Sequence, residues 1–391
     1  MKIQELPLTG EKGLAGAVAA NLATVHQQLF LSWQMDRSEQ VPAVQNLLTD
    51  LDVPQTTNGL TVQFMLPLAA LPVLQKWSRQ LFGDQQLNGS LQVVYEQHRQ
   101  IWQAGRFTFD VTSKPLIYAI LNITPDSFYD GGEYYHQQQW QQQIERLIHD
   151  GADIIEVGGQ TTRPGGFHEI SPEEEKRRIL PAINFLHQRY PQVAIAVDTY
   201  KLPVMKAALD AGVDIINDVE AFDTEDKQTL LAQSSAGLVT MHSSRDREYD
   251  HLTAEMHRFF ERNLADLQQA GIDLKRVVID QGIGYSKVAD GNQDSAMMRN
   301  IDQFNDFQRP ILVAISRKGF GQKLLGLAKK DRLPVTLVAE AYMYLHGGRV
   351  LRVHDVAETH QLIVMLEAIN HGYWNRDLNQ ESQDGKTNEH D

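Results

Sequence analysis

The alternation of short apolar runs with longer amphipathic segments, from Leu116 to Asn370, constrains the fold of this chain more than any other feature. Short buried strands that alternate with amphipathic helices build parallel sheets, so this stretch predicts an α/β fold. Eight strands, each followed by a crossover, are the number in a (β/α)8 TIM barrel of ~250 residues. A doubly wound open sheet is the alternative, but it does not ordinarily need eight parallel strands. The predicted strands are Leu116–Leu121, Ile154–Val157, Val193–Val197, Ile215–Ile216, Leu238–Met241, Val277–Ile279, Ile311–Ala314 and Val350–Val353.

Helices and one hairpin are predicted around these strands. Phe107–Val111 alternates apolar and polar residues, and Ser113–Pro115 then turns the chain into Leu116, which predicts a hairpin that closes the bottom of the barrel. Ser171-Pro172 is typical of a helix start, with an N-cap serine and a proline in the first turn. The predicted helices are Pro172–Arg189, Pro203–Ala211, Leu252–Ala270 and Ala357–Asn370.

Residues 1–103 carry no recognisable chemical motif and predict a small α+β extension. They contain no glycine-rich phosphate loop and no cluster of histidines or carboxylates, which favours an interaction or oligomerisation role over a second active site. Helices are predicted over Leu14–Leu31 and Leu71–Leu81, and strands over Leu60–Phe64 and Leu91–Tyr95. The predicted division is therefore an extension at 1–103, a barrel at 104–375 and a polar, disordered tail at 376–391.

Composition narrows the chemistry that this chain can perform. It has no cysteine, which excludes disulfides, thiolate metal sites and a cysteine nucleophile. Its formal net charge of −14 opposes general nucleic-acid binding, because a phosphate backbone would be repelled. No apolar run approaches the ~20 residues that cross a bilayer, and Met1–Glu5 shows no basic segment leading into an apolar one. We therefore expect a cytoplasmic protein without nucleic-acid or membrane partners.

Polar residues follow the predicted strands at almost every carboxyl end. In a parallel barrel these ends meet at one face, where the loops build the active site. The residues in strand order are Asn122, Gly158–Gly166, Asp198, Asn217–Asp218, His242, Asp280–Tyr285, Ser316–Lys318 and Arg352–Asp355. This distribution predicts one site that draws on all eight strands.

Two chemical classes among these residues indicate a substrate with two parts. Acceptors, an amide and one cation suit the hydrogen-bonding edge of a flat nitrogen heterocycle, and this class comprises Asp198, Asn217, Asp280 and Lys318. Donors and positive charge suit an anion such as pyrophosphate, and this class comprises Asn122, Thr162, Arg163, Arg352 and His354. No set of residues resembles a serine or cysteine nucleophile paired with a base.

Structural roles compete with these assignments. Asp198 could be the N-cap of the helix at Pro203, and His354 could be a buried, hydrogen-bonded core histidine. We favour the site role for both, as for Asn217 and Lys318. Structural roles are expected instead for Asp218, His242 and Arg317.

Seven motifs in this region resemble those of dihydropteroate synthases, in order and at family-like spacing. They are Leu-Asn-Ile-Thr-Pro-Asp-Ser-Phe at Leu121–Phe128, Thr-Arg-Pro-Gly at Thr162–Gly165, Val-Asp-Thr at Val197–Thr199, Ile-Asn-Asp at Ile216–Asp218, Asp-x-Gly-Ile-Gly at Asp280–Gly284, Ser-Arg-Lys at Ser316–Lys318 and Arg-Val-His-Asp at Arg352–Asp355. The resemblance covers about residues 106–370. The chain departs from the family pattern at Gln160, Thr161, Tyr200, Gln281 and Gly319, none of which is a predicted ligand.

The resemblance implies a reaction of folate biosynthesis. 6-Hydroxymethyl-7,8-dihydropterin diphosphate and 4-aminobenzoate would give 7,8-dihydropteroate and diphosphate, with Mg²⁺ as cofactor, sulfonamides as inhibitors and a homodimer as a possible assembly. The implied pterin ligands are Asp198, Asn217, Asp280 and Lys318, of which Asp198, Asp280 and Lys318 are taken as catalytic. Asn122 would bind Mg²⁺ and diphosphate. The other implied diphosphate ligands are Thr162, Arg163, Arg352 and His354, and the aminobenzoate pocket would comprise Phe128, Pro164 and Ser316.

Two alternatives stay open at this point. A pterin-dependent methyltransferase would share the pterin contacts but would not need Arg163, Arg352 and His354 for an anion. A catalytically silent, pterin-binding paralogue would act through residues 1–103 as a partner or regulator. Release of diphosphate separates the synthase from both.

Overall fold

The structure is a computed structural model of the 391-residue chain, and it describes residues 1–7, 13–123, 133–160, 169–243, 248–285, 291–375 and 378. Contacts divide the chain into two compact units, which we call the barrel unit, Gln100–Val364, and the N-terminal unit, Met1–Arg99 with Met365–Asp391. The predicted boundaries at 103/104 and 375/376 thus differ from this division. The difference is larger at the C-terminal boundary, because the end of the last helix and the segment after it belong to the N-terminal unit.

The barrel unit contains a closed barrel of parallel strands, which confirms the predicted TIM barrel and excludes the open sheet. In the described part of the chain the strands follow the order β10-β11-β12-β13-β14-β7-β8-β9 around the barrel. Their bounds are β7 Leu116–Asn122, β8 Ile154–Gly158, β9 Ala194–Asp198, β10 Ile215–Asp218, β11 Gly237–Met241, β12 Val277–Asp280, β13 Ile311–Val313 and β14 Gly348–Val353. Every predicted strand overlaps one of these.

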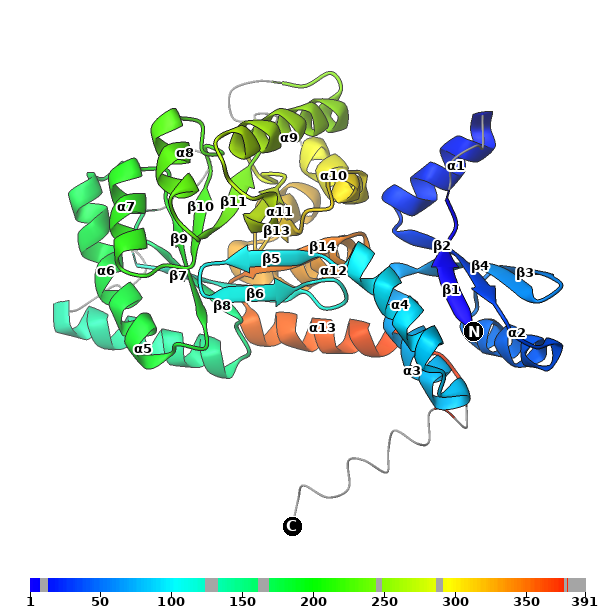
Figure 1. The fold of residues 1–391 in the computed structure, drawn as a ribbon. Coiled ribbons are helices and arrows are strands. Elements are labelled where there is room, and N and C mark those ends of the chain that lie inside the picture. Colours follow the sequence, from blue (N-terminus) through cyan, green and yellow to red (C-terminus); the bar gives the residue numbers. More distant parts are fainter. Residues whose placement is uncertain are drawn as a thin grey trace, which may run out of the picture. The chain divides into compact units, whose positions relative to one another are not determined.

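Helices cover the outside of the barrel, and Figure 1 shows α5 to α9 around β7 to β11. This cover is required because the strands are apolar on both faces. The helices are α5 Glu133–His149, α6 Pro172–Arg189, α7 Leu202–Asp210, α8 Glu225–Ala232, α9 Leu252–Gln269, α10 Asn292–Arg299, α11 Phe320–Leu325, α12 Leu333–Leu345 and α13 Val356–Asn370. As predicted, Ser171 caps α6, since its hydroxyl accepts a hydrogen bond from the Glu174 amide at 3.2 Å.

The predicted hairpin is formed by β5 (Ile101–Ala104) and β6 (Phe107–Asp110). The indole of Trp102 donates to the carbonyl of Arg276 at 2.9 Å, just before β12 begins. The guanidinium of Arg106 pairs with both carboxylate oxygens of Asp214, just before β10, at 2.9 and 2.8 Å. The hairpin therefore closes the amino end of the barrel and leaves the carboxyl end for the site.

The N-terminal unit is a small α+β module, as predicted. Its antiparallel sheet has the order β1-β2-β4-β3, with β1 Lys2–Glu5, β2 Gln28–Gln34, β3 Gln55–Asn58 and β4 Thr61–Pro67. Its helices are α1 Gly13–Thr24, α2 Val41–Asp50, α3 Leu71–Phe82 and α4 Gln85–His98. Alternate residues of β2 and β4 are buried, so one face of the sheet forms the core with the helices.

Two predictions for this unit are wrong. Leu91–Tyr95 is not a strand but the middle of α4, which Asp84 caps by accepting from two backbone amides and which buries Leu87, Leu91 and Val94 at helical spacing. Helix α1 ends at Thr24, and the residues from Gln28 onward form β2 instead of continuing the helix. Aromatic residues at 30 and 33 favour the strand there.

The segment after α13 packs within the N-terminal unit. The rings of Tyr373 and Trp77 lie edge to face, with centroids 6.3 Å apart. The amide of Asn375 donates to Asp50 Oδ2 at 2.7 Å, and Leu378 is buried in the same apolar cluster as Trp77. Except for Leu378, the predicted disordered tail at 376–391 lies outside the described residues. Among the described residues, no helix is both long enough and apolar enough to span a membrane.

Candidate active site

Four residues at the carboxyl ends of adjacent strands are in register. Asn122 of β7 pairs with Gly158 of β8, Gly158 with Asp198 of β9, and Asp198 with Asn217 of β10. Parallel strands of similar length bring these positions to one level of the barrel. The backbone thus juxtaposes three of the predicted ligands, because Asn122 and Asp198 end their strands and Asn217 is the residue before the end of β10.

A buried ionic network lies just below this level. Arg352 of β14 donates through Nε to Glu156 Oε1 at 2.9 Å and through Nη2 to Asp198 Oδ2 at 3.0 Å. The other oxygen of Glu156, Oε2, accepts from the amide Nδ2 of Asn217 at 2.9 Å. Arg352 was predicted as an anion ligand, yet here it is bonded to a predicted pterin ligand. The two predicted classes are therefore joined through Glu156.

The protonation of Asp198 is finely balanced in this network. Burial and the charge of Glu156 together raise the pKa of Asp198 to about 7, although the charge of Arg352 acts to lower it. Its Oδ1 atom is buried and has no hydrogen-bond partner among the described residues. A buried acceptor without a partner is costly, so this atom suits a ligand that brings an N–H donor.

Lys318 and Asp280 form the opposite corner of the site. Burial lowers the pKa of Lys318 to about 8, although Asp280 favours its charged form. The ammonium donates to the carbonyl of Ile283 and lies 4.9 Å from the ring centre of Tyr285. Gly284 has a φ of 88°, and a Cβ there would lie 2.8 Å from Lys318 Cδ, so the glycine makes room for the lysine.

Asp280 is 5% exposed, and burial raises its pKa. Its Oδ1 accepts from the amide of Gly282 at 2.8 Å, which holds the loop after β12. Gln281, a departure from the family pattern, is buried and donates to the carbonyl of Met297 at 3.0 Å, so it ties this loop to α10.

Ser316 and His354 are in direct contact. The hydroxyl of Ser316 accepts from the backbone amide of His354 at 3.1 Å and lies 3.0 Å from its Nδ1. Burial lowers the pKa of His354 to about 4, and the charge of Arg352 contributes to this. The histidine is therefore neutral near pH 7 and can serve an anion only through a ring N–H, not through positive charge.

The remaining predicted ligands are placed less fully. Asn122 is half-buried, and a Cβ on Gly158 would lie 3.0 Å from its Oδ1. This close approach shows that the Asn122 side chain lies over β8. Four predicted site residues lie outside the described residues: Phe128, Thr162, Arg163 and Pro164.

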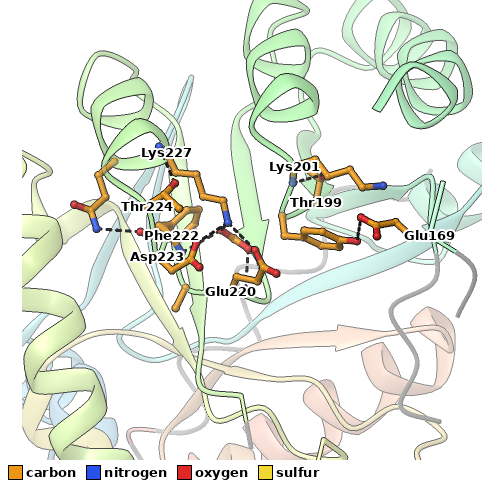
Figure 2. Close-up of polar contacts among 12 residues, drawn as sticks. Glu169, Thr199, Lys201, Glu220, Phe222, Asp223, Thr224 and Lys227 are labelled. Atoms are coloured by element: carbon orange, nitrogen blue, oxygen red, sulfur yellow. Dashed lines mark hydrogen bonds and ion pairs between the residues drawn. The ribbon is translucent and has the colours of Figure 1, made fainter. Parts of the chain in front are cut away.

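The two flanks of residues 161–168 are joined by side chains from the segments that follow β8 and β9. Gln160 Oε1 accepts from Lys201 Nζ at 2.7 Å and from the Ile170 amide at 2.9 Å, and its Nε2 donates to the Tyr200 hydroxyl at 3.1 Å. Tyr200 in turn donates to Glu169 at 3.0 Å (Figure 2). Gln160 and Tyr200 both differ from the residues that are usual in the family, and these two side chains are hydrogen-bonded to each other.

Asp218 is structural, as expected. Its carboxylate accepts from the amides of Glu220 and Phe222 at 2.8 and 3.1 Å and pairs with Lys227 at 3.1 Å. Figure 2 shows the ammonium of Lys227 facing Glu220 and Asp223 as well, at 2.9 Å each. Burial works to lower the pKa of Lys227, but these carboxylates outweigh it and raise the pKa.

Arg317 and His242 also have structural partners. Arg317 forms a two-pronged ion pair with Asp355, with both nitrogen to oxygen distances at 2.8 Å. His242 is buried against Phe259, and its Nε2 lies 3.0 Å from the Tyr249 hydroxyl. Both side chains are therefore held by structural contacts, as expected.

The sequence analysis missed Glu156. This residue lies inside a predicted strand, Ile154–Val157, that is otherwise apolar, and it is 1% exposed. A carboxylate in the middle of a buried strand needs a cationic or hydrogen-bonding partner, which was the available signal. Tyr118 of β7, fully buried beside Glu156, was missed for the same reason, and burial raises its pKa well above the usual value.

Comparison with known proteins shows which family this chain resembles. The family model described as pterin binding enzyme matches residues 118–354. A dihydropteroate synthase from Streptococcus pyogenes is 35% identical over 269 residues, which are 68% of this chain and 98% of that protein. One from Escherichia coli strain K12 is 34% identical over 263 residues, 66% of this chain and 92% of that protein.

Solved structures agree with this match. Dihydropteroate synthase from Xanthomonas albilineans with 4-aminobenzoic acid has a TM-score of 0.65 and 32% identity, and the match covers 69% of this chain and 98% of that one. The same enzyme in complex with 7,8-dihydropteroate has a TM-score of 0.61 and 27% identity, with the same coverage.

Proposed function

The chain belongs to the dihydropteroate synthase family of pterin binding enzymes, and from this premise we propose how its residues divide the reaction among them. It is a transferase of folate biosynthesis that condenses 6-hydroxymethyl-7,8-dihydropterin diphosphate with 4-aminobenzoate. The observation that carries the proposal is the pair of acceptors, Asp198 and Asn217, in register near the carboxyl ends of β9 and β10, across the barrel from Lys318, which follows β13.

The pterin lies against these groups in our proposal. Asp198 and Asn217 accept hydrogen bonds from the amino group and ring N–H of the pterin, which gives Asp198 Oδ1 the partner that it otherwise lacks. Asp280 supplies a further acceptor. Lys318, protonated below pH about 8, donates to an acceptor of the ring.

The leaving diphosphate takes the donors at the same face. Thr162, Arg163 and His354 bind it through N–H and O–H groups, and Arg352 adds its charge while it neutralises Glu156 and Asp198. Water is kept out, so these donors act at low dielectric. No covalent bond to the protein is needed.

Mg²⁺ is the proposed cofactor, with Asn122 as its protein ligand. Mg²⁺ usually takes one or two protein oxygens together with waters and substrate phosphates, and the amide oxygen of Asn122 at the end of β7 fits that pattern. Within the described residues, no group of three histidine, aspartate or glutamate side chains could hold a metal, so the substrate's own oxygens complete the site. When bound, Mg²⁺ would neutralise charge on the diphosphate.

The chemical step is a substitution at the pterin methylene. The bond between this carbon and the diphosphate oxygen breaks first, and its electron pair leaves with the diphosphate. The electron-rich dihydropterin stabilises the cation that remains, and the lone pair of the arylamine then forms the new C–N bond and releases one proton. Phe128, Pro164 and Ser316 shape the pocket for the aminobenzoate, so sulfonamides that mimic it should compete there.

A homodimer and a cytoplasmic location complete the proposal. Three apolar side chains on one side of α12 are exposed, Val338, Tyr342 and Leu345, and a second copy would cover them. Sedimentation analysis tests the dimer, and cell fractionation tests the location.

Product formation tests the function. The purified chain with both substrates and Mg²⁺ should form 7,8-dihydropteroate and diphosphate in equal amounts. Pterin binding without any product would favour the silent paralogue, and methyl transfer from a methylated folate would favour the methyltransferase.

A further inference from the structure

Glu156 lies between two residues that face the pterin site, and nothing in the reaction uses it directly. It is 1% exposed, on β8, and each of its oxygens has a different partner. Oε1 accepts from Arg352 and Oε2 accepts from Asn217 Nδ2 at 2.9 Å. Glu156 therefore links β14 to β10 across the inside of the barrel.

An ionised carboxylate can only accept hydrogen bonds, so this contact is selective. The oxygen and nitrogen ends of an asparagine amide have nearly the same shape, and only their partners decide which end points where. Facing Glu156, Asn217 must turn its NH₂ group toward the carboxylate. Its carbonyl oxygen, Oδ1, then points away from Glu156.

The second contact of Glu156 acts in the same direction. Arg352 lies between Glu156 and Asp198 and bonds to Oδ2 of Asp198, so its charge is balanced by these two carboxylates. The other oxygen of Asp198, Oδ1, has no hydrogen-bond partner among the described residues. Glu156 thus leaves two acceptors, one on β9 and one on β10, at neighbouring positions in register.

We propose that Glu156 is a positioning residue that fixes Asn217 as a hydrogen-bond acceptor and so makes the site select a heterocycle edge that carries N–H donors. This inference rests on the proposed function, because it concerns the pterin site. An amino-pyrimidinone edge has such donors. The 2-oxo analogue of the pterin keeps the ring N–H at N3 but has an acceptor in place of the amino group, so this oxygen would face an acceptor and the analogue would bind more weakly.

Glu156→Gln tests this with little change in shape, since a glutamine amide can accept or donate and no longer dictates the orientation of Asn217. Calorimetric titration of the full chain with 6-hydroxymethylpterin and with its 2-oxo analogue should give two results. Affinity for the pterin falls about tenfold or more, and discrimination between the two ligands shrinks. KM for 4-aminobenzoate should stay within about twofold of the wild-type value.

Glu340→Gln is the matched control. Glu340 is also 1% exposed, but it lies on α12, where its Oε2 accepts from the hydroxyl of Thr359 at 3.1 Å. The same substitution there should leave affinity and discrimination unaltered, although burial raises the pKa of Glu340 to about 8 and so favours its neutral form. If Glu156 were only structural, Glu156→Gln and Glu340→Gln would have the same effect on pterin affinity and discrimination.

A double variant shows whether Glu156 acts through Asn217. If it does, Glu156→Gln combined with Asn217→Ala binds pterin no more weakly than Asn217→Ala alone. Fully additive losses, or wild-type affinity in Glu156→Gln, would overturn the inference. The wild-type chain provides a test without any variant, because equal affinity for the pterin and its 2-oxo analogue would also overturn it. If the wild-type chain binds no pterin at all, the proposed function fails as well.

Discussion

The barrel unit and the N-terminal unit bury different kinds of side chain. Among the described residues of the N-terminal unit, the buried polar side chains are Ser32 and Ser78, both uncharged. The barrel unit buries the ionisable groups Glu156 and Asp280 near its carboxyl end, and the side chain of Asp198 is only 11% exposed. Burying charge costs stability unless it is paired, so buried ionisable groups mark either structural ion pairs, such as Asp218 with Lys227, or a site.

This contrast locates the chemistry. The barrel unit holds its charges in a network with an open acceptor, an arrangement suited to a ligand. The N-terminal unit has an apolar core that includes Trp33, Phe64 and the C-terminal Leu378. We therefore assign the reaction to the barrel unit, and an interaction or oligomerisation role for the N-terminal unit stays a prediction.

The largest expected effect is on stability in the N-terminal unit. Trp33 is fully buried, and its ring centre lies 5.7 Å from that of Phe82 and 6.5 Å from that of Phe64. Trp33→Ala should cost ~3–5 kcal/mol of the unfolding free energy of this unit. Denaturant titration followed by circular dichroism would measure this loss. A fall in kcat/KM of more than about threefold in a protein that remains folded would contradict the assignment of the reaction to the barrel unit alone.

The next effect is on activity in the barrel unit. Lys318→Ala removes the donor opposite Asp198 and should lower kcat/KM for the pterin substrate by a factor of 10 to 100, equivalent to ~1–3 kcal/mol. Burial disfavours the charged form of Lys318 and lowers its pKa to about 8. Removal of this charge should therefore not lower the melting temperature. Steady-state kinetics and a thermal melt on one preparation separate the effect on activity from the effect on stability. Undiminished kcat/KM would remove Lys318 from the site.

The smallest effect is a shift with pH. Asp198, whose pKa burial raises to about 7, must lose its proton to accept two hydrogen bonds, so kcat/KM should rise as pH increases through about 7. Lys318 must keep its proton to donate, so kcat/KM should fall as pH increases through about 8. A profile of kcat/KM against pH should therefore peak between these values. A flat profile from pH 5 to 9 would show that neither group controls binding.

The sequence predicted the barrel well because its signals are local. Each strand is a short apolar run, and the predicted ligands that are described lie near the carboxyl end of a strand or in the loop after it, as with Asp198 and Lys318. Glu156 escaped because it interrupts an apolar run by one residue, and its partners, Asn217 and Arg352, come from strands far away in the sequence. Contacts of that kind follow from barrel closure, which no local pattern encodes.

The N-terminal unit was harder for a related reason. Leu91–Tyr95 has residues that suit a strand, and tertiary packing of Leu87, Leu91 and Val94 made it a helix. The grouping of Tyr373 and Leu378 with this unit joins the two ends of the chain. A contact at that separation leaves no trace in composition or spacing.

The most direct test of the central claim is diphosphate release from 6-hydroxymethyl-7,8-dihydropterin diphosphate, followed with and without 4-aminobenzoate, in the wild-type chain and in Asp198→Asn. The account predicts release that depends on the arylamine in the wild type and is reduced roughly tenfold or more in the variant, which loses the paired carboxylate. Equal release by both proteins, or none by the wild type while the pterin still binds, would contradict the assignment of synthase chemistry to this site.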